Sequence, residues 1–356
     1  MGKHAEYGAL VSGWPDDRFL ALSGARLPIV QAPMAGAGGV ALAIGALKGG
    51  ATGSLPCGMR TPAEVVAEAA EVRAATDGPL NLNFLCHELP EDEDDSAWRA
   101  LLRPVYEAAG ISPGAGGGAV RRPFDEALCA AVEEVRPELV SFHFGLPEDA
   151  LLERVRRTGA KLLANATTIA EARALAEAGV DAIVAQGWEA GGHAGRFLDD
   201  PPDEQMGLFA LLPQVVDAVS VPVVGAGGIG DARGIAAAFL LGASAVQLGT
   251  AYLHCPESLI GKEHRAGLRG DVAEHTAFTN LYSGGLARGL PTRLTDAFGP
   301  IREEVPPYPL ASLALAPLGL KPHFAGQAAR LGKTEGAEML TERLGREALA
   351  LLAGKA

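Results

Sequence analysis

The sequence predicts an α/β protein, and more specifically a closed (β/α)8 TIM barrel. Two observations predict it: short apolar runs alternate with stretches of helical period, and apolar residues predominate in each run instead of alternating with polar ones. Such strands are typical of parallel sheets buried on both faces, and eight of them favour a closed barrel over an open sheet. The expected strands are, in order, Ile29–Met34, Ala51–Leu55, Leu80–Leu85, Leu139–Phe144, Lys161–Ala166, Ala182–Gln186, Val221–Gly225 and Ala245–Gly249.

Helix start signals separate these strands. Thr61 is followed by Pro62 at the first helical position and by Glu64 in the first turn, which is a strong N-terminal pattern. Thr168 with Glu171 three residues later matches a capping box. The clearest helical stretches are Thr61–Ala75, Phe124–Val135, Thr168–Ala178 and Asp231–Leu241.

Two segments exceed what a barrel needs. Residues 88–123 form a long insertion before the fourth strand, with an acidic run (Glu91–Asp95) and a glycine-rich run (Gly110–Gly118). We interpret this insertion as a solvated surface excursion; the alternative is a lid over the barrel mouth with the glycines as hinges. Residues 256–356 are too long for one closing helix, so we expect a mostly helical extension packed on a single domain, 1–356.

Composition and charge narrow the class of protein. The 356 residues carry a formal net charge of −13, which argues against nucleic-acid binding because that relies on basic patches. Four cysteines lie far apart, which predicts reduced thiols and gives no metal-ligand spacing. We find no signal-peptide pattern and no apolar run of membrane-spanning length. The expectation is a cytoplasmic protein without a metal site.

Polar residues gather where the expected strands end. In a (β/α)8 barrel, reactive groups lie at these ends and in the loops that follow. The ends carry amides, two histidines and glycine turns, but almost no carboxylates, which suits a neutral heterocycle with an anionic phosphate better than a metal ion or a sugar. The residues are Ala32, Pro33, Met34, Asn83, His143, Asn165, Gln186 with His193, Gly225–Gly228 and Gln247–Thr250.

The segment Gly225–Gly230 matches the pattern G-x-G-x-x-G, but two features argue against a dinucleotide site. It follows the seventh strand, and Gly249–Thr250 stand where the ribose-binding acid is expected. We interpret Gly227 and Gly228 as a phosphate cradle beside the positive end of the helix near Asp231. The alternative is that the glycines only form a tight turn between strand and helix. This alternative could hold for one loop, but it is less favoured when the loops after strands seven and eight are considered together.

His193 is the candidate for proton transfer. It lies in a glycine-rich loop directly after the sixth strand, where an imidazole can exchange a proton near neutral pH. An exposed histidine without a role is the alternative reading. Gln186, Gly191 and Gly192 beside it favour catalysis.

His143 is the second candidate. Strand alternation puts Ser141, His143 and Gly145 on one face, with Phe142 and Phe144 on the other. We therefore predict that His143 binds substrate, and a buried histidine of the barrel interior is the alternative.

Taken jointly and in order, these residues resemble the FMN-dependent nitronate monooxygenases, formerly called 2-nitropropane dioxygenases. The resemblance runs from Pro28 to about Leu331, and two of its segments, Asn83–His87 and Ser141–Gly145, are similar to the class I branch. The segments that carry it are Gln31–Gly36, Asn83–His87, Ser141–Gly145, Gln186–His193, Gly225–Ile229, Val246–Tyr252 and Ala325–Gln327.

The resemblance implies a barrel that holds FMN in its mouth and oxidises nitronates, such as propionate 3-nitronate, with O2 to a carbonyl compound and nitrite. It makes His193 the base that takes the α-proton of a neutral nitroalkane or orients an ionised nitronate, with the chemistry supplied by the flavin. The positions that it assigns to FMN are Ala32, Pro33, Met34, Asn83, Gln186, Gly191, Gly192, Gly227, Gly228, Gln247, Leu248, Gly249 and Thr250.

The chain departs from the family pattern at two positions where the family usually has an arginine. Ala194 stands where an arginine is usual after the histidine, and Gly285 replaces an arginine in the segment Ser283–Gly289. These losses bear on the anionic substrate more than on FMN.

Two alternatives remain open at the level of sequence. One is an FMN-dependent enoyl-acyl-carrier-protein reductase using NADH, which shares the Glu-x-Gly-Gly-His and Gly-Gly-Ile motifs. The other is a flavin-binding paralogue without turnover. Reaction with nitronate and O2, with NADH, or with neither would separate the three.

Overall fold

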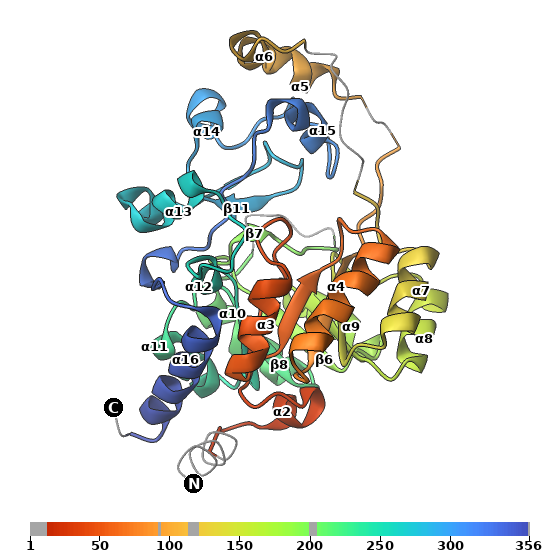
Figure 1. Ribbon diagram of the computed structural model, residues 1–356, viewed down its shortest axis with the longest axis vertical. Coiled ribbons are helices and arrows are strands. Elements are labelled where there is room, and N and C mark those ends of the chain that lie inside the picture. The colour runs from red at the N-terminus through yellow and green to blue at the C-terminus, as the bar shows by residue number, and fades with distance from the viewer. Residues whose placement is uncertain (1–12, 92–93, 113–120, 199–204, 355–356) are drawn as a thin grey trace.

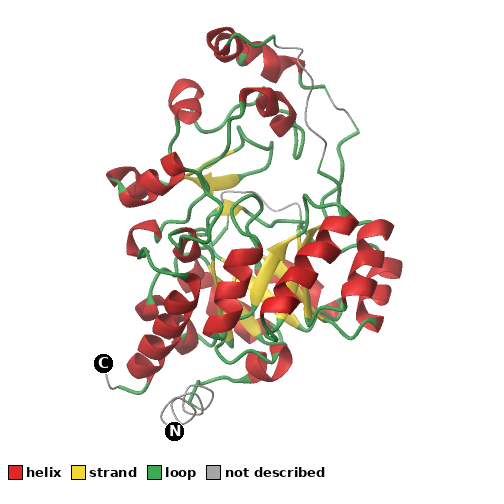
Figure 2. Cartoon of the chain, viewed as in Figure 1, coloured by secondary structure: helices red, strands yellow, loops and turns green. Residues whose placement is uncertain are grey.

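The computed structural model describes residues 13–91, 94–112, 121–198 and 205–354. Its larger part is a barrel of eight parallel strands surrounded by helices (Figures 1 and 2). The barrel strands are β1 (Ile29–Gln31), β2 (Gly53–Pro56), β3 (Leu80–Leu85), β4 (Leu139–His143), β5 (Lys161–Ala166), β6 (Ala182–Gln186), β8 (Val223–Ala226) and β9 (Ala245–Leu248).

The barrel closes between its first two strands. The strand order is β1-β9-β8-β6-β5-β4-β3-β2, so the two edges of the sheet meet at β1 and β2. A bridge between Val30 and Thr52 joins them: the Gln31 N–H donates to the Thr52 carbonyl at 2.9 Å, and the Thr52 N–H to the Ile29 carbonyl at 2.9 Å. The predicted (β/α)8 TIM barrel is confirmed, and its first and second strands are joined by this bridge.

Strand ends follow local backbone chemistry. The expected bounds of β3, β5 and β6 are confirmed, and the ends of β2, β8 and β9 shift by at most two residues. β1 ends at Gln31 instead of Met34, because Pro33 has no N–H for the ladder and the chain turns at Met34, whose carbonyl accepts the Ala37 N–H at 3.0 Å. β4 ends at His143 because Phe144 has a φ of +67°.

Each barrel strand is followed in the chain by an outer helix. The capping box predicted on Thr168 with Glu171 is confirmed, and the start signal at Thr61 also forms a capping box with Glu64. The outer helices are α3 (Val40–Gly49), α4 (Pro62–Ala75), α7 (Glu126–Val135), α8 (Asp149–Arg157), α9 (Ile169–Glu177), α10 (Leu208–Ala218), α11 (Ala232–Leu240) and α16 (Ala337–Leu352).

The barrel interior is filled by small and branched side chains. Val30, Leu163, Ala182 and Val224 are buried together there. The short helix α2 (Arg18–Ser23) adds the fully buried Phe19 to the same cluster, so this ring plugs one end of the barrel. The opposite end, at the carboxyl ends of the strands, is left for the candidate site.

A second lobe lies over that opposite end, away from α2 (Figure 1). We define it as residues 94–112 and 262–331. A small antiparallel sheet, β10-β11-β7, connects it to the loop after β6. Helices dominate its regular structure, as expected for the C-terminal extension, but the two strands were not expected. Its elements are α5 (Ser96–Leu101), α6 (Arg103–Ala109), α13 (Lys262–Arg269), η2 (Asp271–Glu274), β10 (Ala277–Thr279), β11 (Ala287–Gly289), α14 (Arg293–Phe298), α15 (Ala311–Leu315), η3 (Ala316–Leu318) and η4 (Ala329–Leu331).

The insertion before β4 is anchored to the second lobe at three buried residues, Trp98, Leu102 and Tyr106, while most of its other described residues are exposed. Helices α5 and α6 bury Trp98 and Tyr106 completely against Leu281 and Leu315 of the C-terminal segment. The Trp98 Nε1–H donates to the Ala311 carbonyl at 3.3 Å, which fixes the indole as well as burying it. The lid stays a prediction, because most of the glycine-rich run lies outside the described residues.

Several general expectations can be compared with the described residues. All four cysteines are free thiols, and three of them are buried. In the described ranges, no helix has the length and hydropathy to cross a bilayer. Those ranges also contain no group of three histidine, cysteine or acidic residues arranged to hold a metal ion.

Candidate active site

His193 lies at the junction of the barrel and the second lobe. The strand β7 (Gly192–His193) pairs with β11, so that His193 stands opposite Ala287. Gly191 allows this approach, because a Cβ there would lie 2.5 Å from the Ala325 carbonyl carbon. Gly192 has a φ of +77°, a conformation that favours glycine. The glycines in this loop are therefore required by the backbone.

The side chain of Gln186, at the end of β6, clamps the His193 loop. Its Nε2 donates to the His193 carbonyl at 2.8 Å. Its Oε1 accepts the Gly195 N–H at 2.8 Å and the Asn165 Nδ2–H at 3.0 Å. Gln186 is buried, so these bonds compete with little water. The loop on both sides of His193 is thus held by strands β5 and β6.

The His193 ring is held among residues from three parts of the chain. Its Nε2 lies 2.7 Å from the Ser283 hydroxyl oxygen. Its ring centroid is 5.9 Å from that of Phe144, 5.2 Å from Tyr308 and 5.3 Å from Phe324, with edge-to-face orientations. These contacts fix the plane of the imidazole before any ligand binds.

His143 lies beneath the same loop. A Cβ on Gly195 would lie 2.5 Å from the His143 Cε1, so the loop packs directly on this ring. His143 also hydrogen-bonds to the His193 backbone. The neighbouring Phe144 corrects the face assignment made from strand alternation: at φ +67° the strand pattern is broken, and the Phe144 ring lies 4.5 Å from the His143 ring instead of facing away from it.

Electrostatics keep both imidazoles neutral. Burial lowers the pKa of His193 well below its usual range, and the positive charge of Arg121 lowers it further; His143 and His87 act in the same direction, because two neighbouring imidazoles disfavour carrying a proton at the same time. Burial also lowers the pKa of His143 to about 4, against the opposing effect of its hydrogen bond to the His193 backbone. A neutral His193 at neutral pH can accept a proton.

The glycine loop after β8 has the features of an anion cradle. Gly227 and Gly228 have φ values of +106° and +70°. Within the described residues, neither of their N–H groups donates to a protein acceptor. A Cβ on Gly227 would lie 3.0 Å from the Ala190 nitrogen, so this loop also touches the loop that carries His193. Free amides beside the N-terminus of α11 fit a phosphate.

The ends of β1 and β9 meet beside this cradle. A Cβ on Gly249 would lie 3.7 Å from the Ala32 Cβ and 3.8 Å from the Met34 sulfur, so the three residues are neighbours. Gly249 is also the N-cap of the short helix α12 (Thr250–Leu253). The Thr250 hydroxyl accepts the Gly326 N–H at 2.9 Å. Residues from both ends of the chain thus share one wall of the barrel mouth.

Other predicted positions differ in what they can offer. Gln247 is half-buried next to Val30 in the register of β1 and β9, whereas Leu248 is fully buried in the helix–sheet core and has only its backbone to offer. Asn83, on β3, donates to the Ser141 hydroxyl at 2.9 Å. Pro33 follows the end of β1 beside Met34.

Several site residues escaped the sequence reasoning. His87, Arg121 and Tyr308 lie close together: the His87 ring is 4.8 Å from Tyr308, and its Nε2–H donates to the Arg121 carbonyl at 3.1 Å. Ser283 and Phe324 complete the surroundings of His193. Two of them lie in segments already singled out in the sequence: His87 ends the segment Asn83–His87, which carries the resemblance, and Ser283 begins the segment Ser283–Gly289, which departs from the family pattern.

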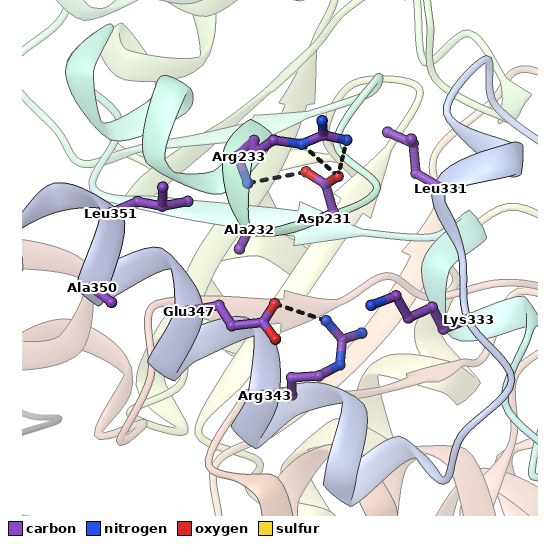
Figure 3. Close-up of a pocket in the computed structure, with 9 residues that line it drawn as sticks. All are labelled: Asp231, Ala232, Arg233, Leu331, Lys333, Arg343, Glu347, Ala350 and Leu351. Atoms are coloured by element: carbon purple, nitrogen blue, oxygen red, sulfur yellow. Dashed lines mark hydrogen bonds and ion pairs between the residues drawn. The ribbon is translucent and has the colours of Figure 1, made fainter. Parts of the chain in front are cut away.

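A separate cleft of about 450 Å³ lies on the outside of the barrel between α11 and α16 (Figure 3). Asp231 pairs with Arg233 at 2.5 Å, and Glu347 with Arg343 at 2.9 Å. Its lining contains neither His193 nor the predicted FMN positions. We therefore assign the chemistry to the barrel mouth.

The protein is a closed (β/α)8 barrel with a neutral histidine and an amide cradle at its mouth. These features are typical of the class of barrel enzymes whose reaction takes place at the carboxyl ends of the strands. Comparison with known proteins narrows this class. The nitronate monooxygenase family profile matches residues 17–347. The chain belongs to the nitronate monooxygenase family, a family of flavin-dependent oxidoreductases.

Individual relatives agree with this assignment. A nitronate monooxygenase from Paraburkholderia phytofirmans is 41% identical over 92% of this chain and 94% of its own. The crystal structure of a nitroalkane oxidase from Streptomyces ansochromogenes is 33% identical and superposes with a TM-score of 0.86 over 95% of this chain and 100% of its own. FabK from Thermotoga maritima is more distant, at 25% identity and a TM-score of 0.73 over 95% and 97% of the two chains.

Proposed function

We propose that this chain is an FMN-dependent nitronate monooxygenase, which oxidises alkyl nitronates such as propionate 3-nitronate with O2 to a carbonyl compound and nitrite. The observation that carries the proposal is a neutral, fixed His193 beside an unpaired amide cradle in a chain of this family. When bound, FMN supplies the electron transfer between nitronate and O2. We also propose a cytoplasmic location.

The residues divide into holding and reacting groups. The Gly227 and Gly228 amides and the N-terminus of α11 would hold the phosphate. The remaining predicted contacts, from Ala32, Pro33, Met34, Asn83, Gly191, Gly192, Gln247, Leu248, Gly249 and Thr250, would line the ring and ribityl chain. Gln186 is predicted to contact FMN as well, and its bonds to the His193 loop support a positioning role.

His193 would act on the substrate carbon. Because its pKa is lowered, the ring is unprotonated at neutral pH and can take the α-proton of a neutral nitroalkane, or orient a nitronate that is already ionised. His143 is proposed to bind substrate, and its bond to the His193 backbone supports a further role in fixing the loop. Because barrel and second lobe both contribute to the site, residues 1–356 are proposed to act as one unit.

An anaerobic experiment tests the function. The yellow protein is mixed with propionate 3-nitronate in one cuvette and with NADH in another, and the flavin absorbance is followed. We expect loss of the oxidised flavin spectrum with the nitronate and its return on admission of air. Bleaching by NADH alone would instead support the reductase alternative, and no response to either would support a paralogue without turnover.

The role of His193 has its own test. We expect His193→Gln to keep its FMN but to lose roughly 10²–10⁴-fold in kcat/KM with a neutral nitroalkane, the usual range for a general base. With pre-ionised nitronate the loss should be much smaller, because no proton has to be removed. Equal losses with the two substrates would contradict the assignment of His193 as the base.

A further inference from the structure

Arg121 is a cation of the candidate site that comes from an unexpected part of the chain. It lies at the end of the insertion, where its carbonyl accepts the His87 Nε2–H at 3.1 Å. Its guanidinium is near enough to the Tyr308 hydroxyl to lower the pKa of that group against the effect of burial, and the Tyr308 ring is 5.2 Å from that of His193. Its charge also acts on His193 itself. Arg121 therefore belongs to the group of residues that faces the reacting histidine.

Arg121 has no acidic partner among the described residues: no carboxylate there forms an ion pair with it. The titratable groups in the described part of the chain that shift the pKa of His193 are Arg121, His143 and His87, and none of them is a carboxyl group. A half-buried guanidinium without a counter-ion is electrostatically costly and is best satisfied by an anion from outside the chain.

Arg121 also lies near the place where the family usually has an arginine and this chain has Gly285. Gly285 faces the same rings: a Cβ there would lie 3.2 Å from the Tyr308 Cδ2 and 3.3 Å from the His193 Cδ2. A long cationic side chain at residue 285 would therefore start next to this cluster, but the chain has glycine there and Ala194 after the histidine. Arg121 brings a positive charge to the same rings from another element.

We propose that Arg121, together with the Tyr308 hydroxyl, binds the negatively charged oxygens of the substrate and so makes this site selective for anionic nitronates over neutral nitroalkanes. The two oxygens of a nitronate are coplanar, as in a carboxylate, and match the fork of N–H donors on a guanidinium. The identity of the anion rests on the proposed function, whereas the existence of the anion site does not.

The kinetic test compares Arg121 with its exposed neighbour Arg122. We expect Arg121→Gln to raise KM for ethyl nitronate by roughly ten- to hundredfold, as for loss of a charge-assisted hydrogen bond, with a smaller change in kcat. KM for neutral nitroethane should hardly change. Arg121→Lys should restore part of the nitronate affinity, and Arg122→Gln should behave as the unmodified protein.

A binding measurement separates this inference from the proposed function. Nitrate, a planar anion that is not oxidised, is titrated into the flavin-loaded protein by calorimetry. We expect Arg121→Gln to weaken nitrate binding by a factor similar to the change in nitronate KM, while Arg122→Gln and Arg121→Lys bind it more tightly than Arg121→Gln. That result supports the anion site even if nitronates are not oxidised.

The contrary results are equally distinct. Equal nitrate affinity in the unmodified protein, Arg121→Gln and Arg122→Gln would overturn the inference, as would an unmeasurably weak affinity in the unmodified protein. An unchanged nitronate KM in Arg121→Gln would overturn it while leaving the monooxygenase function intact. Near-ultraviolet circular dichroism and flavin content show that each variant is folded.

Discussion

Replacement of Glu171 by glutamine is expected to loosen the catalytic loop and to destabilise the fold. Glu171 is only 1% exposed. Its Oε2 accepts the Thr167 N–H at 2.6 Å, the Thr167 hydroxyl at 2.8 Å and the Thr168 N–H at 3.2 Å. Its Oε1 accepts the Phe197 N–H at 2.8 Å and the Leu198 N–H at 3.3 Å, beyond His193 in the chain. One carboxylate thus joins the capping box of α9 to that loop.

An amide can supply only one of these two acceptors. Glu171→Gln therefore leaves at least two buried N–H groups facing an NH2 group, at about 1–3 kcal/mol for each unsatisfied donor. We expect a loss of about 2–4 kcal/mol in the free energy of unfolding, measured by urea titration. If the amide oxygen stays on the helix side, the Phe197 anchor is lost and kcat/KM with nitronate should fall about tenfold, because a displaced catalytic group costs rate.

Glu64→Gln is the matched control. Glu64 forms the same capping box on α4, accepting the Thr61 N–H at 2.7 Å and the Thr61 hydroxyl at 2.9 Å, but it is exposed and contacts no catalytic loop. We expect a much smaller shift of the urea midpoint and unchanged activity. Equal shifts in the two variants, or full stability of Glu171→Gln, would refute the reasoning from burial.

Two further predictions concern close packing and pH. Gly195→Ala should lower the free energy of unfolding by about 1–3 kcal/mol and should also lower kcat/KM, because its Cβ would lie 2.2 Å from the Asn165 Nδ2. Urea titration measures the first effect and nitronate assays measure the second. If neither changes, the loop can move away at no cost and the reasoning from close packing is wrong. His264 is 5% exposed, stacks on His323 at 4.9 Å, and has its pKa lowered to about 4, first by burial and then by His323. Since the unfolded chain takes up this proton near pH 6.5, stability should fall by about 3 kcal/mol as the pH drops from 6.5 to 4. His264→Phe should make that fall shallower in urea midpoints measured at pH 7 and pH 5, and an unchanged fall would contradict the role of His264.

Much of the barrel could be predicted because its strands are buried on both faces. Predominantly apolar runs mark β3, β5 and β6 with their observed bounds, and capping chemistry marks where α4 and α9 begin. The rule that strand ends meet at one edge of a barrel also places His193, Gln186 and the glycine loops in one region. These features depend on local sequence and on the arrangement of a barrel, in which all strand ends meet at one edge.

The remaining features depend on contacts that no local pattern encodes. Phe144 takes a positive φ, which is rare for an aromatic residue, next to Gly145 at +87°, so the expected alternation of faces breaks at the strand end. Ser283 and Tyr308 reach His193 from far along the chain. β7 has only two residues, too few to show any period. Arg121 belongs to the insertion 88–123, whose composition predicted a solvated surface segment instead of a part of the site.

The pairing of β1 with β9 has a consequence for biosynthesis. Ile29 pairs with Val246, more than two hundred residues later, and α16, which packs on both α3 and α11, covers this side of the barrel only after another ninety residues. At a typical translation rate of about 5–20 residues per second, the edge of β1 stays without its partner for roughly 10–40 s on the ribosome. An unpaired strand edge invites pairing with other chains. The nascent protein should therefore be a strong client of chaperones until α16 emerges.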